Sequence, residues 1–365
     1  MNFTLPQLLK ALIDQNGSDL HISPGSPPRM RINGALLPLD MPPITPQESM
    51  QLCYSVLNDA QRKEFDESRE IDLAFNVKNL SRFRANIYTQ QGQVSGAFRV
   101  IPLKVKNLKE LQLPSVVEKI CTLHRGLVLV TGPTGSGKST TIAAMINHIN
   151  ESRQDHILTI EDPVEFLHSS KQSLVNQREI GHDTLSFGRA LKSALRQDPD
   201  VVLVGEMRDL ETVRLAVTTA ETGHLVFATL HTNSCVSTLS RIIDVFPPEQ
   251  QATIRNQLAS TLQVTMSQTL LPSLTGGRVM ALEIMIPNAA IRNLIREDKF
   301  NQIYSSMQGG QDQTGMQTLS QSLLGLVERR QITPQLALEV ATEPQELEML
   351  LSSKLGLKVQ AVLKR

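Results

Sequence analysis

The sequence predicts an α/β protein in which a larger domain, built on a parallel sheet, follows a smaller α+β domain. Three observations carry this prediction. A glycine-rich loop separates an apolar run from a helical pattern within 127–150, and strand-like and helix-like segments alternate over 115–264. The first hundred residues show short alternating strands, which are typical of an antiparallel sheet. We therefore expect a first domain at 1–101, a linker at 102–114 and a second domain at 115–365.

The first domain opens with an amphipathic helix. Its leucines recur at helical spacing from Leu5 to Leu12, and Gly17 ends it. The Asn33-Gly34 pair indicates a hairpin turn between two strands. We expect strands at 18–23, 29–32, 71–77, 81–89 and 93–101 and a helical stretch at 45–65. Together these elements make a small domain with an antiparallel sheet.

Four apolar runs in the second domain each end at polar residues. The runs are Gly126–Val130, His156–Ile160, Val201–Val204 and Leu225–Leu230. Because ligands of a parallel sheet bind beyond the carboxyl ends of its strands, we expect these polar residues to converge at one edge. Beyond Pro272 the pattern becomes mostly helical to about residue 351. The amphipathic segments there are 289–296, 317–330 and 334–351.

The composition narrows the class of protein. Basic and acidic residues number 36 each, and this zero net charge argues against a protein that mainly binds nucleic acid. No segment approaches the ~20 apolar residues of a membrane-spanning helix, and the opening helix carries too little positive charge for a membrane-binding face. The cysteines Cys53, Cys121 and Cys235 are too far apart for a CxxC zinc site and indicate reduced thiols.

The residues Gly-Pro-Thr-Gly-Ser-Gly-Lys-Ser form a Walker A sequence between a strand and a helix. Glycines let the backbone turn sharply and direct successive N–H groups at phosphate oxygens. Lys138 supplies positive charge for the β- and γ-phosphates, and Ser139 offers a hydroxyl to Mg²⁺. The sequence thus predicts that the chain binds a nucleoside triphosphate, ATP, with Mg²⁺. The residues expected to contact it are Gly132, Pro133, Thr134, Gly135, Ser136, Gly137, Lys138, Ser139 and Thr140.

The other strand ends supply groups for hydrolysis. Glu206 follows an apolar strand and is expected to hold the water shell of Mg²⁺, as a Walker B carboxylate. Glu161, Asp162 and Glu165 could each orient or deprotonate the attacking water, and the pattern does not rank them. His231 could hydrogen-bond the γ-phosphate and respond to its loss.

Other charged residues need a separate interpretation. Asp200 lies at the amino end of its strand, away from the expected site, and is interpreted as a turn residue. Arg82, Arg84 and Arg99 lie on strand-like segments of the first domain, and alternation places Arg82 and Arg84 on one face. Such arginines could approach a γ-phosphate, often from a neighbouring subunit, or could form a solvated basic face.

Together these motifs resemble those of the secretion ATPases of type IV pilus and type II secretion systems, most closely the PilT-like retraction ATPases. The resemblance covers nearly the whole chain. It rests on the Walker A segment, an acidic box, a Walker B stretch, a histidine box and three shorter segments similar to those of the retraction subgroup. In this order the segments are Gly132–Ile146, Ile157–Phe166, Ala194–Thr212, Ala220–Asn233, Gly17–Ser23, Ala290–Glu297 and Gly315–Leu323.

The resemblance implies a cytoplasmic homo-hexameric ring that hydrolyses ATP at the cytoplasmic face of the inner membrane. It implies a PAS-like first domain and a RecA-like second domain, with nucleotide between them. The implied function is that of a motor for type IV pilus retraction, in which pilin disassembly produces twitching motility. The implied partner is the inner-membrane platform protein of the pilus, through which the motor would associate with the membrane. No nucleic acid is expected.

The resemblance also assigns roles to individual residues. They are the catalytic base Glu165, the Walker B residue Glu206, the histidine-box residues His224 and His231, and the arginine fingers Arg84 and Arg99. The segment Ala290–Glu297 implies a surface that retraction needs and hydrolysis does not.

Several alternatives are left. Extension ATPases of the same superfamily are longer at the N-terminus and usually carry a CxxC…CxxC zinc element, and the lack of both favours retraction. An accessory paralogue of the retraction motor would share the same ATPase core. A nucleic-acid motor is disfavoured by the neutral charge and few aromatic residues, because tracking along a single strand favours basic grooves with stacking platforms. A nucleotide-regulated scaffold without turnover is disfavoured by the complete set of hydrolysis residues.

Overall fold

The computed structural model of this chain describes residues 3–32, 34–101, 105–309 and 314–357. The described residues fall into two compact units, which are treated separately here. Unit 1 is Met1–Val105 with Pro163–Leu167, and unit 2 is Lys106–Asp162 with His168–Arg365. The units therefore divide within the stretch expected as a linker, of which residues 102–104 lie outside the described part.

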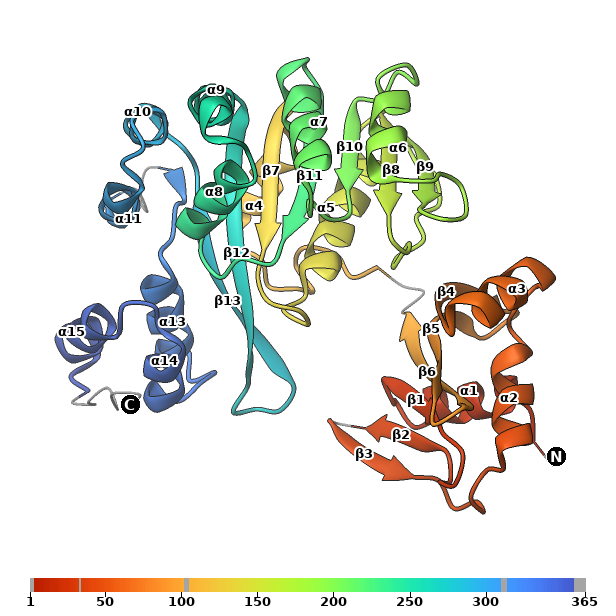
Figure 1. Cartoon of the computed structure of the whole chain (residues 1–365). Helices are drawn as coiled ribbons and strands as arrows, with labels where there is room; N and C mark the ends of the chain where they lie inside the picture. The colour runs from red at the N-terminus through yellow and green to blue at the C-terminus, as the bar shows by residue number, and fades with distance from the viewer. Residues whose placement is uncertain (1–2, 33, 102–104, 310–313, 358–365) are drawn as a thin grey trace. The chain divides into compact units, whose positions relative to one another are not determined.

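Unit 1 is built on an antiparallel sheet with the strand order β3-β2-β1-β6-β5-β4 (Figure 1). The strands are β1 (Asp19–Ile22), β2 (Arg29–Ile32), β3 (Ala35–Pro38), β4 (Glu70–Val77), β5 (Ser81–Gln90) and β6 (Gln93–Ile101). Neighbouring strands are antiparallel throughout this order. Because β1 pairs with β6, the first hairpin and the last strands of the unit share one sheet and one core.

Helices of unit 1 pack on this sheet. They are α1 (Leu5–Asp14), α2 (Pro46–Tyr54) and α3 (Asp59–Ser68). The leucine face of α1 is buried in the core, in keeping with its helical spacing. The single helical stretch expected at 45–65 is wrong, because Asn58 starts a new helix. Its side chain accepts a hydrogen bond from the Gln61 N–H at 2.9 Å, and its own N–H donates to the Gln61 side chain at 3.0 Å.

The hairpin expected at Asn33-Gly34 is present between β2 and β3. Ile32 pairs with Ala35, and Gly34 has a φ of 88°, in the left-handed region that favours glycine. Asn33 lies outside the described residues. The turn implies a strand after Gly34, but the pattern does not give the bounds of β3, because this strand is exposed along its whole length and shows no alternation of apolar and polar residues.

Unit 2 contains a second sheet, in the order β13-β12-β7-β11-β10-β8-β9 (Figure 1). Its strands are β7 (Gly126–Thr131), β8 (His156–Glu161), β9 (Leu174–Glu179), β10 (Val201–Val204), β11 (Leu225–Leu230), β12 (Leu262–Pro272) and β13 (Arg278–Met285). Neighbours in this order are parallel, apart from β12 with β13. The strands β7, β11, β10 and β8 lie side by side, so their carboxyl ends share one edge. The predicted α/β fold class is confirmed.

Helices cover both faces of this sheet (Figure 1). They are α4 (Ser115–Ile120), α5 (Lys138–Ser152), α6 (Phe187–Ala194), α7 (Leu210–Glu221), α8 (Cys235–Asp244), α9 (Pro248–Thr261), α10 (Ala289–Arg296), a 3₁₀ turn (Phe300–Gln302) and α11 (Ile303–Gln308). Leu127 and Leu129 of β7 pack in the cluster that includes α6 to α11, whereas Val128 and Val130 pack with α4 and α5. The sheet is buried on both sides, which explains its continuous apolar runs.

The C-terminal part departs from the mostly helical pattern expected after Pro272. β13 returns along β12 across Gly276 and Gly277, whose φ angles are 92° and 72°. The helix expected at 334–351 is divided, because Pro344 starts a new helix and cannot continue the previous one. The helices of this part are α13 (Leu319–Glu328), α14 (Pro334–Val340) and α15 (Pro344–Leu355). They pack together on the β12–β13 hairpin.

Of the outer elements of unit 2, two helices were predicted from the sequence and one strand was not. The helix expected at 289–296 is confirmed as α10, and α13 lies within the expected 317–330. The edge strand β9 has no counterpart in the prediction, because its residues are exposed or half-buried and form no apolar run. At the C-terminus, residues 358–365 lie outside the described part.

The structure also shows the state of the cysteines and whether metal-binding groups or membrane-spanning helices occur among the described residues. Cys53, Cys121 and Cys235 are buried free thiols. Burial raises the pKa of Cys53 and of Cys121 to about 12, so both thiols are protonated at neutral pH. Among the described residues, no group of three or more His, Cys, Asp or Glu side chains could hold a metal ion. Likewise, none of the described helices has the length and apolar character to span a bilayer.

Candidate active site

The phosphate loop follows β7, and its shape requires its glycines. Gly132 has a φ of 141°, and a Cβ there would lie 2.3 Å from the Gln268 carbonyl oxygen and 2.6 Å from Ser136 Oγ. Gly135 and Gly137 have φ angles of 80° and 89°, a left-handed backbone that side chains rarely adopt. A larger residue at any of these three positions would therefore strain the loop.

Gln268 of β12 supports the phosphate loop from the neighbouring strand. This residue is fully buried, and its Nε2 donates to the Ser136 carbonyl at 2.7 Å. A buried amide in a core strand needs hydrogen-bond partners, and the loop provides one. Gln268 was not predicted from the sequence, because β12 contains several polar residues and the pattern does not single out this one.

The N-terminal end of α5 completes a site for phosphate. This helix begins at Lys138, directly after the loop, and runs to Ser152. The first N–H groups of a helix have no partners within the helix, so such an end binds anions readily. Ser136 Oγ, in the same loop, is buried and has no hydrogen-bond partner within the described structure. This donor set fits the phosphates of a nucleotide.

Lys138 is a buried cation at this loop. Its Nζ donates to the Gly132 carbonyl at 2.9 Å and to the Pro133 carbonyl at 3.1 Å, and lies 3.4 Å from His231 Nδ1. Burying an ammonium group is costly, and the loop carbonyls offset part of that cost. A phosphate would be a stronger partner, because both groups are then charged.

His231 and Glu206 meet at the carboxyl ends of β11 and β10. His231 Nε2 is 3.0 Å from Glu206 Oε1, and Arg208 Nη2 is 2.6 Å from Glu206 Oε2. Burial raises the pKa of Glu206, but hydrogen bonds and charges from Arg208 and His231 outweigh it, so the pKa lies below its usual value. Glu206 is therefore ionised at neutral pH, which suits a carboxylate near Mg²⁺.

Lys138, His231 and Glu206 thus form a continuous polar row across two strand ends and the phosphate loop. The strands β10 and β11 are tied together beside this row, where Thr229 Oγ1 donates to the Gly205 carbonyl at 2.5 Å. Arg208, which sequence reasoning left without a role, extends the row beyond Glu206. The structure brings these groups to the same edge of the sheet.

Carboxylates of the acidic box have different surroundings. Glu161 ends β8, and its Oε1 accepts from Thr159 Oγ1 at 2.7 Å and from Gln177 Nε2 at 3.2 Å. Asp162 is exposed. Glu161 is therefore held by side chains of its own sheet, which distinguishes it from the other two candidates for a base.

Glu165 lies in Pro163–Leu167, the segment that belongs to unit 1. Its Oε1 is 3.8 Å from Arg84 Nη1, and Arg84 Nη2 is 2.6 Å from Asp72 Oδ2. Arg99 Nε is 2.8 Å from Asp19 Oδ1 (both on the same sheet). The two arginines expected as fingers are therefore paired with carboxylates of unit 1, and a role at a phosphate requires them to exchange these partners.

His224 and Asp200 lie at the opposite edge of the sheet. The His224 carbonyl accepts from the Gly126 N–H, at the start of β7, at 2.9 Å, and its Nδ1 is 3.0 Å from the Thr219 carbonyl. Asp200 Oδ2 accepts from the His156 N–H at 2.9 Å, as a turn residue can. The structure does not bring His224 to the phosphate loop of its own chain. It therefore does not support a contact of His224 with a nucleotide bound to that loop.

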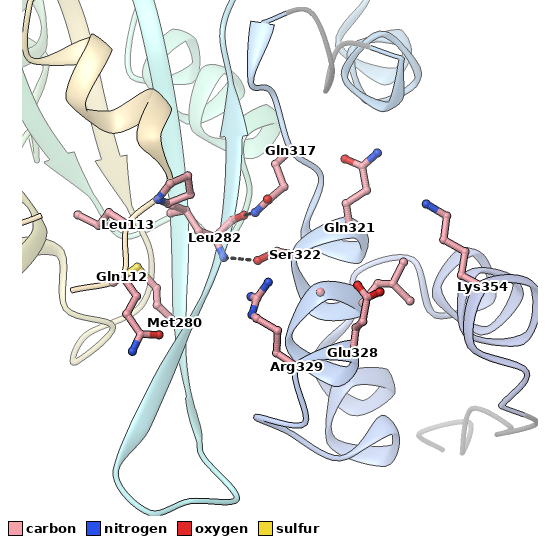
Figure 2. Close-up of a pocket in the computed structure, with 13 residues that line it drawn as sticks. Gln112, Leu113, Met280, Leu282, Gln317, Gln321, Ser322, Glu328, Arg329 and Lys354 are labelled. Carbon is pink, nitrogen blue, oxygen red and sulfur yellow. Dashed lines mark hydrogen bonds between the residues drawn. The ribbon is translucent and has the colours of Figure 1, made fainter. Parts of the chain in front are cut away.

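A cavity of about 600 Å³ lies elsewhere in unit 2, between β13 and the C-terminal helices (Figure 2). Met280 and Leu282 of β13 line it, as do Arg329 and Lys354. Ser322 Oγ accepts from the Leu282 N–H at 3.0 Å, which ties α13 to the strand (Figure 2). The lining residues come from outside the phosphate loop, so this cavity is separate from the nucleotide site.

The chain is similar to known proteins over nearly its whole length. Residues 4–333 match the family described as type II/IV secretion system protein. The chain is 52% identical over 341 residues to the type IV pilus retraction ATPase PilT of Pseudomonas aeruginosa, covering 93% of this chain and 99% of that protein. It is 38% identical over 351 residues to the type IV pilus ATPase PilU of the same organism, covering 96% and 91%.

The fold is also similar to a solved structure, that of the pilus retraction motor PilT with bound ADP. The TM-score is 0.89 at 49% sequence identity, and the match covers 95% of this chain and 100% of that one. The similarity therefore includes residues of both units and is not confined to the phosphate loop.

Proposed function

The chain belongs to the type II/IV secretion system protein family, and we propose that it is an ATPase that powers the retraction of type IV pili. ATP hydrolysis drives the disassembly of pilin subunits and so produces twitching motility. The motor works in the cytoplasm, at the cytoplasmic face of the inner membrane, where the platform protein of the pilus is its partner. Similarity over almost the full length of a retraction ATPase supports this proposal.

One observation carries the ATPase part of the proposal. It is the row of contacts that links Lys138 to His231 at 3.4 Å and His231 to Glu206 at 3.0 Å, beside the phosphate loop. A P-loop lysine, a carboxylate at a strand end and a polar residue between them are what hydrolysis of a β–γ bond requires. A binding module that only senses nucleotide would not need all of them.

Each residue of the proposed site has a role in ATP hydrolysis. Lys138 neutralises the β- and γ-phosphates, while Ser139 and Glu206 hold Mg²⁺ and its water shell. When bound there, Mg²⁺ would supply positive charge against the negative charge that develops as the bond breaks. His231 hydrogen-bonds the γ-phosphate and loses that contact when phosphate leaves. Glu165 orients or deprotonates the attacking water.

Deletion of the gene tests the retraction part of the proposal. A retraction motor predicts cells with surplus surface pili and no twitching, whereas an extension ATPase predicts cells without pili. The higher identity to PilT than to PilU argues against an accessory paralogue. ATPase activity stimulated by DNA or RNA would instead indicate a nucleic-acid motor.

We further propose a homo-hexameric ring in which Arg84 or Arg99 serves the phosphate site of a neighbouring subunit. Specific activity should then rise with protein concentration. Mixing Arg84→Ala subunits with Lys138→Ala subunits should restore part of the turnover, because a mixed interface can pair an intact loop with an intact arginine. Phosphate release from each variant alone and from the mixture measures this. The ring arrangement is wrong if activity is independent of concentration and mixing rescues nothing.

The helix α10 carries the surface proposed to couple hydrolysis to retraction. Ile291 and Ile295 are buried, whereas Arg292 and Arg296, four residues apart on another face of the helix, differ in exposure. Arg292 is half-buried, and its Nη1 donates to the Ala259 carbonyl at 2.5 Å, at the end of α9. Arg296 is exposed. The two arginines therefore have separate roles, the first in holding α10 and the second at the surface.

Changing Arg296 to Glu should stop retraction while ATP hydrolysis stays within about twofold of wild type, because exposed surface changes rarely disturb a fold. Pilus retraction in cells and phosphate release in solution measure the two effects. Arg292→Ala is the contrasting variant: it removes hydrogen bonds to α9 and should lower the free energy of unfolding by about 1–2 kcal/mol. Normal retraction in Arg296→Glu, or a parallel loss of hydrolysis, would contradict the coupling role.

A further inference from the structure

Glu283 is a buried carboxylate that the proposed hydrolysis steps do not use. It lies on β13 opposite Ser267 of β12 and is 3% exposed. Its Oε2 accepts from the Cys235 N–H at 2.6 Å. Burial raises the pKa of Glu283, and the hydrogen bonds with Cys235 oppose that rise. A polar group in such surroundings costs free energy unless it is bonded, so this contact fixes where the side chain can lie.

The Cys235 N–H belongs to the first residue of α8, close in sequence to His231. Ser234 caps the same helix and accepts from the Ser237 N–H at 3.1 Å. Because a helix leaves several N–H groups unsatisfied at this end, Ser234 and Glu283 satisfy different ones. The partial positive charge of a helix N-terminus also favours a carboxylate there. Glu283 therefore bonds the start of α8 to β13.

The first turn of α8 is connected in turn to both sides of the site. Thr238 Oγ1 lies 2.7 Å from Thr232 Oγ1, beside His231, and 3.4 Å from Thr131 Oγ1, the last residue before the phosphate loop. A displacement of α8 would thus move the segment that carries His231 relative to the loop.

The strand β13 offers a fixed support for this contact. On one side of Glu283, the Leu282 N–H donates to Ser322 Oγ at 3.0 Å (Figure 2). On the other side, Ile284 pairs with Gln317 through backbone bonds of 2.8 and 2.9 Å. The residue is thus held on a strand bonded to α13 and to the turn before it.

We propose that Glu283 is a positioning residue for the hydrolysis site. It fastens α8 to β13 and so keeps His231 between Lys138 and Glu206. This inference rests on the proposed ATPase function. This role requires an acceptor oxygen at this place, so the charge of Glu283 matters less than its hydrogen bond to Cys235.

Glu283→Met tests the proposal, because methionine has a similar shape and no acceptor oxygen. We expect kcat for ATP hydrolysis to fall about tenfold, since small misplacements of a catalytic group have large effects, while KM for ATP stays within about twofold. Glu283→Gln keeps an acceptor and should recover most of the lost kcat. A general loss of stability would not lower kcat at constant KM, nor would Glu283→Gln then recover kcat. Unchanged kcat in Glu283→Met overturns the inference, whereas an inactive wild-type protein overturns the proposed ATPase function.

Cys235→Pro tests the same bond from the donor side and decides the matter if Glu283→Met does not fold. Proline removes the N–H and is favoured at the first position of a helix. Ser234, which precedes it, already has the extended backbone that proline requires, with φ of −150° and ψ of 159°. The same fall in kcat at constant KM is expected, and wild-type kcat in a folded Cys235→Pro protein would overturn the proposal.

Discussion

Lys138→Ala is expected to abolish ATP hydrolysis, with kcat lower by about 10³-fold or more, and to weaken nucleotide binding strongly. The ammonium is held by the Gly132 and Pro133 carbonyls and lies 3.4 Å from His231, so it is positioned before nucleotide arrives. Alanine leaves the loop without the charge that offsets the β- and γ-phosphates. Steady-state phosphate release measures turnover, and titration with a fluorescent nucleotide measures affinity.

The loss should not come from unfolding. Lys138 interacts with loop carbonyls and not with the core clusters, so thermal melting of Lys138→Ala should stay close to that of wild type. Lys119→Ala removes an exposed lysine from α4 of the same unit and serves as the matched control with normal turnover. Normal turnover in Lys138→Ala would mean that hydrolysis takes place elsewhere.

The phosphate loop and the strand ends could be predicted from sequence because their causes are local. Gly132 is required by a backbone φ of 141° and by the close approach of Gln268, and glycine at such a position is visible in the sequence. His231 directly follows β11, so parallel pairing alone takes it to the edge that Glu206 shares. Apolar runs predicted the inner strands because β7, β10 and β11 are buried on both faces of the sheet.

Partners could not be predicted where they come from distant parts of the chain. Arg292 is a charged residue of the amphipathic helix α10, and its guanidinium donates to a carbonyl at the end of α9, which the helical pattern does not reveal. Gln268 and Glu283 are polar residues within strands, and their partners Ser136 and Cys235 are far away in sequence. Side-chain pairing of this kind depends on tertiary packing, which the periodicity of the sequence does not reveal.

Glu165→Gln is expected to bind Mg²⁺ and ATP with nearly wild-type affinity but to hydrolyse ATP about 10²- to 10⁴-fold more slowly. A glutamine of the same shape cannot take a proton from water. In unit 1, Arg84 keeps its 2.6 Å contact with Asp72 when the 3.8 Å contact with Glu165 is weakened, so folding should be unaffected. Single-turnover phosphate release, with nucleotide binding measured in parallel, separates chemistry from affinity.

Glu161→Gln is the decisive comparison, because the sequence leaves both residues open as the base. Glu161 already accepts hydrogen bonds from Thr159 and Gln177, and the amide oxygen of glutamine could accept the same bonds. Its loss of kcat should therefore be much smaller than that of Glu165→Gln. Asp162→Asn changes an exposed carboxylate of the same box and controls for the loss of one charge. A fully active Glu165→Gln protein with an inactive Glu161→Gln protein would transfer the role of base to Glu161, at the end of β8.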